Sequence, residues 1–195
     1  MSTIYRFSRN HHLIFVKFVY NNTMNKILGH LKTINQHKIK VTWLCFRCHL
    51  YKQGILHDLS KYSWCELKTG FRYYQGYRSP IDAQKEAEGY SLSWLHHKGR
   101  NKHHWEYWLD NGPFGVIPVE MPTNYVIEMF CDRVAASMIY QKDQYTDHSA
   151  LDYYEQGRDR ILIHPNTDRL IHHLLSYLAE HGLDQTITYI RTQIK

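Results

Sequence analysis

The stretch LHDLSKYSWCEL, residues 56–67, places a histidine and an aspartate side by side, followed by a lysine and a glutamate. If His57 and Asp58 are helical, their side chains project about 100° apart, so both can bind one ion above the helix. An imidazole and a carboxylate suit zinc, iron or manganese. Lys61 can meet a phosphate or steady the carboxylate, and Glu66 can accept a proton or orient a ligand. The alternative is an ordinary turn at the start of a helix, so the function of the dipeptide depends on further ligands.

A histidine on a predicted helix over residues 36–52 supplies one such ligand. His37, Val41, Leu44 and Cys48 recur at spacings of four, three and four, which places them on one helical face. His37 therefore lies on the apolar stripe. It is either a hydrogen-bonded histidine of the core or a metal ligand.

An aspartate interrupts the apolar face of a second predicted helix, residues 122–141. The face comprises Tyr125, Met129, Asp132, Ala136 and Ile139. A buried carboxylate without a partner costs several kcal/mol, so Asp132 must be paired, protonated or bound to a metal. Arg133 points about 100° away and is a poor partner within the helix. A salt bridge to another helix is the alternative to a metal.

The segment SWLHHKGRNKHHWEYW carries four histidines. If the long helix opened by Pro80 continues through Gly99, one four–three stripe contains Ala83, Ala87, Tyr90, Trp94, His97, Asn101 and His104. His96, Arg100 and His103 then form a neighbouring stripe at the edge. The histidines could instead lie on a solvated face, but the three nearby tryptophans favour burial.

In chain order the candidate ligands read His37, His57-Asp58, His97, His104 and Asp132. This H…HD…H…H…D order resembles the HD-domain superfamily, all-helical proteins that bind one or two metals, and HDLSK resembles its HD-x-x-K form. A stronger resemblance links the chain to an uncharacterised bacterial and phage family, a domain of unknown function. Its blocks appear here as LHDLSKYSWCEL, SWLHHKGRNKHHWEYW (with its HxxxNxHHW motif), MPTNYVIEMFCDRVAA and ILIHPNT, and the resemblance covers roughly residues 24–175.

The HD resemblance implies an all-α, single-domain helical bundle with a central metal site. It implies that a first metal is bound by His37, His57, Asp58 and Asp132. His97 and His104 match the pair that binds a second metal in dinuclear members, with Asp58 bridging. His96 and His103, each one residue earlier, are the alternatives, and the four–three stripe favours His97 and His104. The expected cofactor is one or two divalent ions of manganese, iron or zinc.

The leading functional hypothesis is a metal-dependent phosphohydrolase acting on a nucleotide or another phosphate ester. Its catalytic candidates are Asp58, Lys61 and Glu66, and its substrate-binding candidates are Arg100, Asn101 and His103. The same ligands could serve a dinuclear iron oxygenase or other redox enzyme. A third hypothesis is a non-catalytic nucleic-acid-binding protein, since sixteen tyrosines and five tryptophans can stack on single strands.

Composition supports one globular domain. The 195 residues are 43% hydrophobic and 14% aromatic, which disfavours wholesale disorder. The net charge of +6 suits an anionic ligand, but the basic residues are scattered, which weakens the case for nucleic acid. Cys45 and Cys48 form an isolated CxxC in a predicted buried helix, where we expect packing rather than metal or redox chemistry. Reduced thiols predict a cytoplasmic location.

The remaining pattern predicts helices almost throughout residues 23–195, an HD-like domain, after an N-terminal arm over residues 1–22. Within the arm, LIFVKFVY (13–20) is too short for a membrane span and lacks a following signal-cleavage site, so we expect a strand or packed arm. Thr23 is a candidate cap for the first helix, and the second should end at Gly54. Residues 110–119 predict a loop. In ILIHPNT, His164 either reaches the pocket or lies beside a helix capped by Asn166 or Thr167.

Overall fold

The computed structural model describes the backbone of residues 9–194 and the side chains of residues 23–194. Its α-helices are α1 (Arg9–Arg47), α2 (Tyr51–Leu56), α3 (Trp64–Tyr73), α4 (Pro80–Glu88), α5 (Leu92–Lys98), α6 (Thr123–Gln141), α7 (Ser149–Arg158) and α8 (Pro165–Tyr189). Short 3-10 helices are η1 (Leu59–Tyr62), η2 (Trp105–Trp108) and η3 (Lys142–Gln144), and a π-helical turn, η4 (Ile190–Ile194), follows α8. The strands β1 (Leu109–Gly112) and β2 (Gly115–Pro118) form a small hairpin. The prediction of a single, essentially all-α domain is confirmed.

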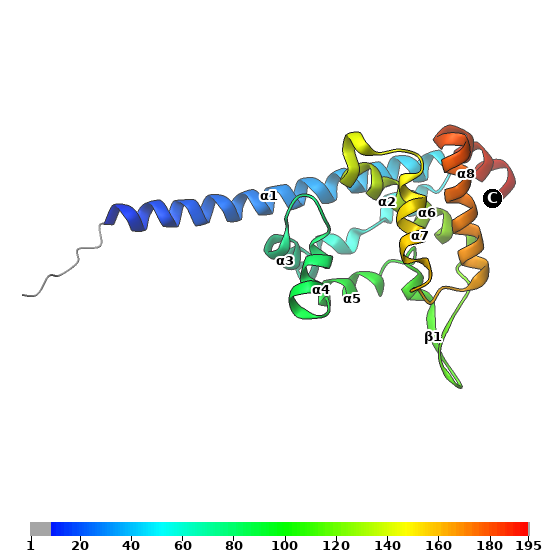
Figure 1. Ribbon diagram of the computed structural model, residues 1–195, viewed down its shortest axis with the longest axis horizontal. Coiled ribbons are helices and arrows are strands. Elements are labelled where there is room, and N and C mark those ends of the chain that lie inside the picture. Colours follow the sequence, from blue (N-terminus) through cyan, green and yellow to red (C-terminus); the bar gives the residue numbers. More distant parts are fainter. Residues whose placement is uncertain (1–8, 195) are drawn as a thin grey trace, which may run out of the picture.

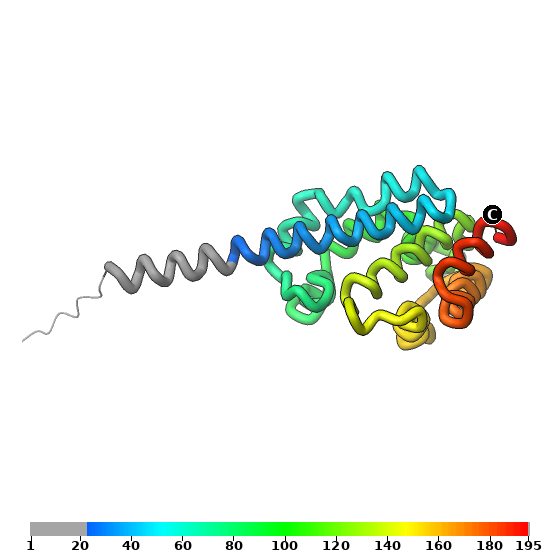
Figure 2. Tube along the Cα trace, turned by 90° about the horizontal axis from the view of Figure 1, so that it is seen from above, coloured from blue at the N-terminus to red at the C-terminus, as the bar shows by residue number. Residues whose placement is uncertain are grey.

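Helix α1 runs along the length of the molecule (Figure 1) and forms the spine of the domain. Its C-terminal half has α2 along one side and α6 along the other (Figure 2), and α8 packs on α6. The core between these helices contains Val41, Leu44, Val126, Phe130, Ile171, Leu174 and Leu178, all fully buried. Burial of these apolar side chains is the main stabilising contribution to the bundle. Within the described part of the chain, no helix is long and apolar enough to cross a membrane.

The structure corrects the expected N-terminal helices. Residues 23–47 belong to the single helix α1, which also includes residues 13–20, so no strand forms there and Thr23 begins no helix. Residues 1–8 of the expected N-terminal arm lie outside the described part. The second helix ends at Arg47 rather than at Gly54, because His49 has the left-handed φ of 58°. Gly54 instead lies in α2, where an added Cβ would be 3.0 Å from Cys45 and Phe46.

The helix predicted from Pro80 through Gly99 is divided in two. Helix α4 ends at Glu88 and is capped by Gly89, whose φ of 80° disfavours residues with a Cβ. Ser91 then caps α5 by accepting a hydrogen bond from the backbone N–H of Trp94 at 3.0 Å. Helix α5 ends at Lys98, so the four–three stripe does not continue into residues 99–104.

Two further expectations concern the second half of the chain. The predicted loop at 110–119 is mostly an antiparallel hairpin, with Leu109 opposite Pro118, and it projects from the helical body (Figure 1). His164 caps α8 itself, because its Nδ1 accepts a hydrogen bond from the N–H of Asn166. The predicted cap Asn166 is therefore wrong, as is Thr167. Helix α8 contains one non-helical residue, Gly182, at which the helix is kinked.

The CxxC cysteines pack in the core. Cys45 and Cys48 are fully buried in hydrophobic surroundings together with Cys131. Cys65 is exposed. The expectation of a packing role agrees with this burial.

Candidate metal centre

The His57-Asp58 dipeptide forms the turn between α2 and η1. Asp58 has φ 55° and ψ 23°, a left-handed conformation that aspartate tolerates better than most residues. Both side chains are almost completely buried, with relative exposures of 1% for His57 and 2% for Asp58. The dipeptide is therefore a turn, and this turn directs an imidazole and a carboxylate into the interior.

A first group of potential ligands surrounds Oδ2 of Asp58. His37 comes from α1 and Asp132 from α6, and the ligand atoms of His37, His57, Asp58 and Asp132 all lie within 4.8 Å of one another. Nε2 of His37 lies 2.9 Å from Oδ1 of Asp132. Nε2 of His57 lies 3.2 Å from Oδ2 of Asp58 and 3.3 Å from Oδ1 of Asp132. Three separate parts of the chain thus bring the four residues predicted for the first metal together.

A second group faces the other oxygen of Asp58. Nε2 of His97 lies 3.3 Å from Oδ1 of Asp58, and Nε2 of His103 lies 3.5 Å from the same oxygen. His104 completes this group, whose ligand atoms also lie within 4.8 Å of one another. Because Oδ1 and Oδ2 face different groups, the Asp58 carboxylate is placed to bridge two ions. The prediction had chosen between His103 and His104, whereas the structure brings both of them to this group.

Glu128 connects the two groups. Its Oε1 accepts hydrogen bonds from Nδ1 of His57 at 2.9 Å and from Nδ1 of His103 at 3.1 Å. A carboxylate can only accept, so each Nδ1 carries the hydrogen and each Nε2 faces Asp58. A carboxylate behind the imidazole is the usual arrangement of histidines that bind metals. Glu128 lies four residues before Asp132 on α6, and that helical spacing was the sequence signal for it.

Glu66 has the same role for a third imidazole. Its Oε2 accepts a hydrogen bond from Nδ1 of His97 at 2.9 Å, and its Oε1 accepts one from Nδ1 of His96 at 2.7 Å. Both oxygens of Glu66 are thus used in orienting imidazoles. His96, an alternative ligand in the sequence, lies behind Glu66 and belongs to neither group around Asp58.

Several buried polar atoms of the centre have no hydrogen-bond partner among the described residues. These are Oδ1 of Asp58 and the Nε2 atoms of His57, His103 and His104. Buried polar atoms are nearly always hydrogen-bonded, because desolvation without a partner costs free energy. Their convergence from different parts of the chain fits a cation between them. Nitrogen and oxygen donors of this kind suit zinc, iron or manganese.

The charges of the centre favour the ligand forms of its side chains. Burial alone would raise the pKa of Asp58, but His57, Lys61 and His97 lower that pKa well below its ordinary value. Nζ of Lys61 lies 2.5 Å from Oδ2 of Asp58, so this lysine steadies the carboxylate. Burial and the neighbouring imidazoles hold the pKa of His104 well below the ordinary range, which keeps this ring neutral.

His57 is the exception in the metal-free protein. Burial would lower its pKa, but the carboxylates of Asp58, Asp132 and Glu128 raise it well above the ordinary value. A metal ion at Nε2 must therefore displace a proton.

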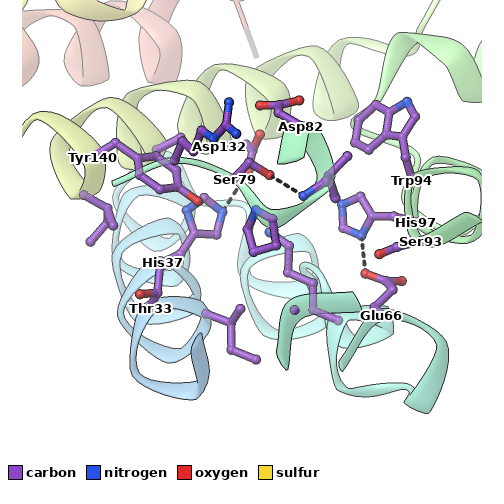
Figure 3. A pocket seen from close by; sticks show the side chains of 18 of the residues that line it. Thr33, His37, Glu66, Ser79, Asp82, Ser93, Trp94, His97, Asp132 and Tyr140 are labelled. Atoms are coloured by element: carbon purple, nitrogen blue, oxygen red, sulfur yellow. Dashed lines mark hydrogen bonds and ion pairs between the residues drawn. The ribbon is translucent and has the colours of Figure 1, made fainter. Parts of the chain in front are cut away.

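A cavity of about 530 Å³ opens onto the centre. Its lining includes His37, Asp132, His97, His104, Lys61 and Glu66, so both groups face it. In Figure 3, His37, Asp132 and Tyr140 lie on one side of the cavity and Trp94, His97 and Glu66 lie on the other. The volume is in the usual range for small-molecule sites.

The predicted substrate-binding residues do not line this cavity. Arg100 is exposed, and its guanidinium donates to the backbone oxygen of His96 at 3.3 Å. Asn101 is buried and donates from its amide to Oγ of Ser60 and to the backbone oxygen of His97. His103 belongs to the second ligand group. The sequence did not identify Lys85 and Arg133, which do line the cavity.

The fold and the centre define a helical protein with a buried cluster of histidines and carboxylates able to bind a metal. The chain belongs to the family of unknown function DUF5662, whose model matches residues 26–177 and so includes every residue of the two groups. Membership of an uncharacterised family is thereby confirmed. No curated protein matches the chain, and no solved structure matches it. The resemblance to the HD-domain superfamily stays an expectation.

Proposed function

We propose that the protein is a metal-dependent phosphohydrolase that acts on a nucleotide or another phosphate ester. The observation that carries the proposal is the position of Asp58, whose two carboxylate oxygens face two different groups of imidazole and carboxylate ligands beside one cavity. Manganese, iron and zinc are the candidate ions, in one or two copies. Such an ion, when bound, supplies a water of lowered pKa and polarises a phosphoryl oxygen.

The residues of the chain provide the binding and the positioning. Asp58 and Asp132 supply carboxylate oxygens, while Glu128 and Glu66 fix the imidazole orientations. Lys61 keeps Asp58 ionised by pairing with its carboxylate, which leaves the imidazoles that face the cavity available to a metal. The net charge of +6 attracts an anionic substrate.

A dinuclear iron oxygenase is the second proposal. The observation that favours it is the shared Asp58, because one carboxylate between two ligand groups supports a pair of ions. Imidazole and carboxylate ligands suit iron as well as manganese or zinc. Elemental analysis and an optical or paramagnetic spectrum of aerobically purified protein separate the proposals. A colourless, iron-free and hydrolytically active protein contradicts the oxygenase.

We also propose a cytoplasmic location, because the sequence pattern of the cysteines favours packing over disulfide formation.

The test of hydrolysis uses the full chain loaded separately with manganese, iron and zinc. We expect release of phosphate from at least one nucleotide or generic phosphate ester, and loss of that activity in His57→Ala and Asp132→Asn. The matched control is His148→Ala, because His148 is exposed and lies outside both ligand groups. Metal-loaded protein that is inert towards all these esters contradicts the proposal.

A further inference from the structure

The cavity beside the metal centre is lined by several cationic side chains. Among the residues that the structure describes, these lysines and arginines are Lys61, Arg78, Lys85 and Arg133. Lys61 pairs with Asp58 at 2.5 Å, and Nη1 of Arg78 pairs with Oε1 of Glu86 at 2.7 Å. Lys85 makes a loose pair with Asp82 at 3.9 Å. Three of the four cations are therefore already opposed by a carboxylate.

Arg133 differs from the other three. Its Nε is buried and has no hydrogen-bond partner, and no carboxylate in the described part of the chain forms an ion pair with its guanidinium. The guanidinium carbon lies 4.8 Å from the centre of the Tyr154 ring. That contact attracts the cation but gives the buried Nε–H no acceptor. A half-buried guanidinium with a desolvated Nε and no paired carboxylate favours binding of an anion.

A carboxylate also lines the cavity but forms no ion pair with Arg133 in the described part of the chain. Glu106 also lines the cavity, and its Oε2 is buried without a hydrogen-bond partner in the described residues. Because Glu106 and Arg133 line one cavity without forming an ion pair, the guanidinium is available to a ligand.

Arg133 also has the right position relative to the metal centre. It follows Asp132 directly on α6, so its backbone is adjacent to that of a ligand of the first group. Both residues line the same cavity, which lets one ligand contact the metal centre and the guanidinium. The planar guanidinium can donate two parallel hydrogen bonds to a phosphate.

We infer that Arg133 binds the anionic phosphoryl group of the substrate and is the specificity-determining cation of this cavity. The inference rests on the proposed phosphohydrolase function and deepens it. It replaces Arg100, which is exposed and lies outside the cavity lining.

The test is calorimetric titration of the metal-loaded full chain with inorganic phosphate. We expect Arg133→Gln to weaken phosphate binding by about tenfold or more, because a charge-assisted hydrogen-bond pair is lost. Arg133→Lys keeps the positive charge but loses the planar guanidinium with its two parallel donors. This variant should therefore weaken phosphate binding by a smaller factor. The matched control Arg100→Gln should bind as the wild type does. Metal content, measured by elemental analysis, should be equal in all four proteins.

Two results would overturn the inference. One is phosphate binding by Arg133→Gln within about twofold of the wild type, which is below the expected loss of a charged hydrogen bond. The other is a wild type that binds metal but no phosphate. If Arg133→Gln does not fold, Arg133→Lys tests the inference in its place, because its affinity for phosphate should still be lower than that of Arg100→Gln.

Kinetics with p-nitrophenyl phosphate separate this inference from the proposed function. For an active enzyme, Arg133→Gln should raise KM more than it lowers kcat, as expected for a binding group. Arg133-dependent phosphate binding by a protein that hydrolyses no ester contradicts the hydrolase and supports the anion site. Hydrolysis with unchanged KM in Arg133→Gln contradicts the anion site alone.

Discussion

Nδ1 of His57 lies 2.9 Å from Oε1 of Glu128, and the same oxygen accepts a hydrogen bond from His103. One carboxylate oxygen thus fixes an imidazole in each of the two ligand groups. Glu128 therefore couples the groups by orienting a ring in each, while Asp58 contacts both groups directly.

Glu128→Gln should weaken metal binding at both groups. The amide keeps the size of the carboxylate, but its oxygen is neutral and its nitrogen cannot accept a hydrogen bond from an imidazole. Loss of such an outer partner lowers metal affinity by about 10–100-fold. Competition with a chromophoric chelator measures the affinity. The control is Glu180→Gln, an exposed glutamate, and equal affinities of the two variants would show that Glu128 does not orient the ligands.

Lys61→Met should destabilise the metal-free protein more than the metal-loaded one. Removal of Lys61 leaves the Asp58 carboxylate buried without its lysine partner, which costs on the order of 3 kcal/mol in the free energy of unfolding. A bound cation replaces the lost positive charge, so the loss should shrink when metal is present. Urea unfolding with and without metal provides the comparison, and Lys52→Met is the exposed control. An identical loss in both states would argue against a cation beside Asp58.

The contact between α7 and α8 should depend on pH through Asp168. Hydrogen bonds from Arg158 and Tyr154 lower the pKa of Asp168, although burial opposes this. A lowered folded-state pKa supplies stability that is present above the ordinary value of 3.8 and is lost as pH falls through the folded pKa.

Asp168→Asn should therefore lower the free energy of unfolding by about 1 kcal/mol at pH 7, a value that allows for the partial exposure of Arg158. In acid, the difference in the free energy of unfolding between Asp168→Asn and the wild type should disappear. Chemical unfolding of metal-free protein at pH 7 and in acid measures it, with the exposed Asp143→Asn as control. A difference that persists unchanged in acid would exclude the carboxylate as its cause.

Helical periodicity predicted well where the helix exists. His37 lies on the regular helix α1 and Asp132 on the regular helix α6. Both were predicted to face the interior, and the structure places Nε2 of His37 2.9 Å from Oδ1 of Asp132. The period of 3.6 residues fixes side-chain directions only within such a helix. Glu128 could have been found in the same way, from its spacing of four residues to Asp132.

Periodicity did not identify the second group fully. His103 and His104 follow the end of α5, in a segment of turns where helical spacing no longer determines side-chain direction. Adjacent histidines can both face one atom in such a segment, which a helix would prevent. Gly89 and Ser91 were the sequence signals for the break before α5. The sequence did not identify Arg133 as a candidate anion-binding residue. That role depends on the absence, among the described residues, of a carboxylate paired with its guanidinium, which is determined by tertiary packing.

The central claim is that the residues around Asp58 bind a metal in the protein's interior. Its most direct test is elemental analysis of the full chain after loading with manganese, iron or zinc and removal of free metal. We expect one to two tightly bound ions per chain in the wild type and in the surface variant His148→Ala, and a marked loss in His57→Ala. Metal contents that are equally negligible in all three proteins, or unchanged by His57→Ala, would contradict the account.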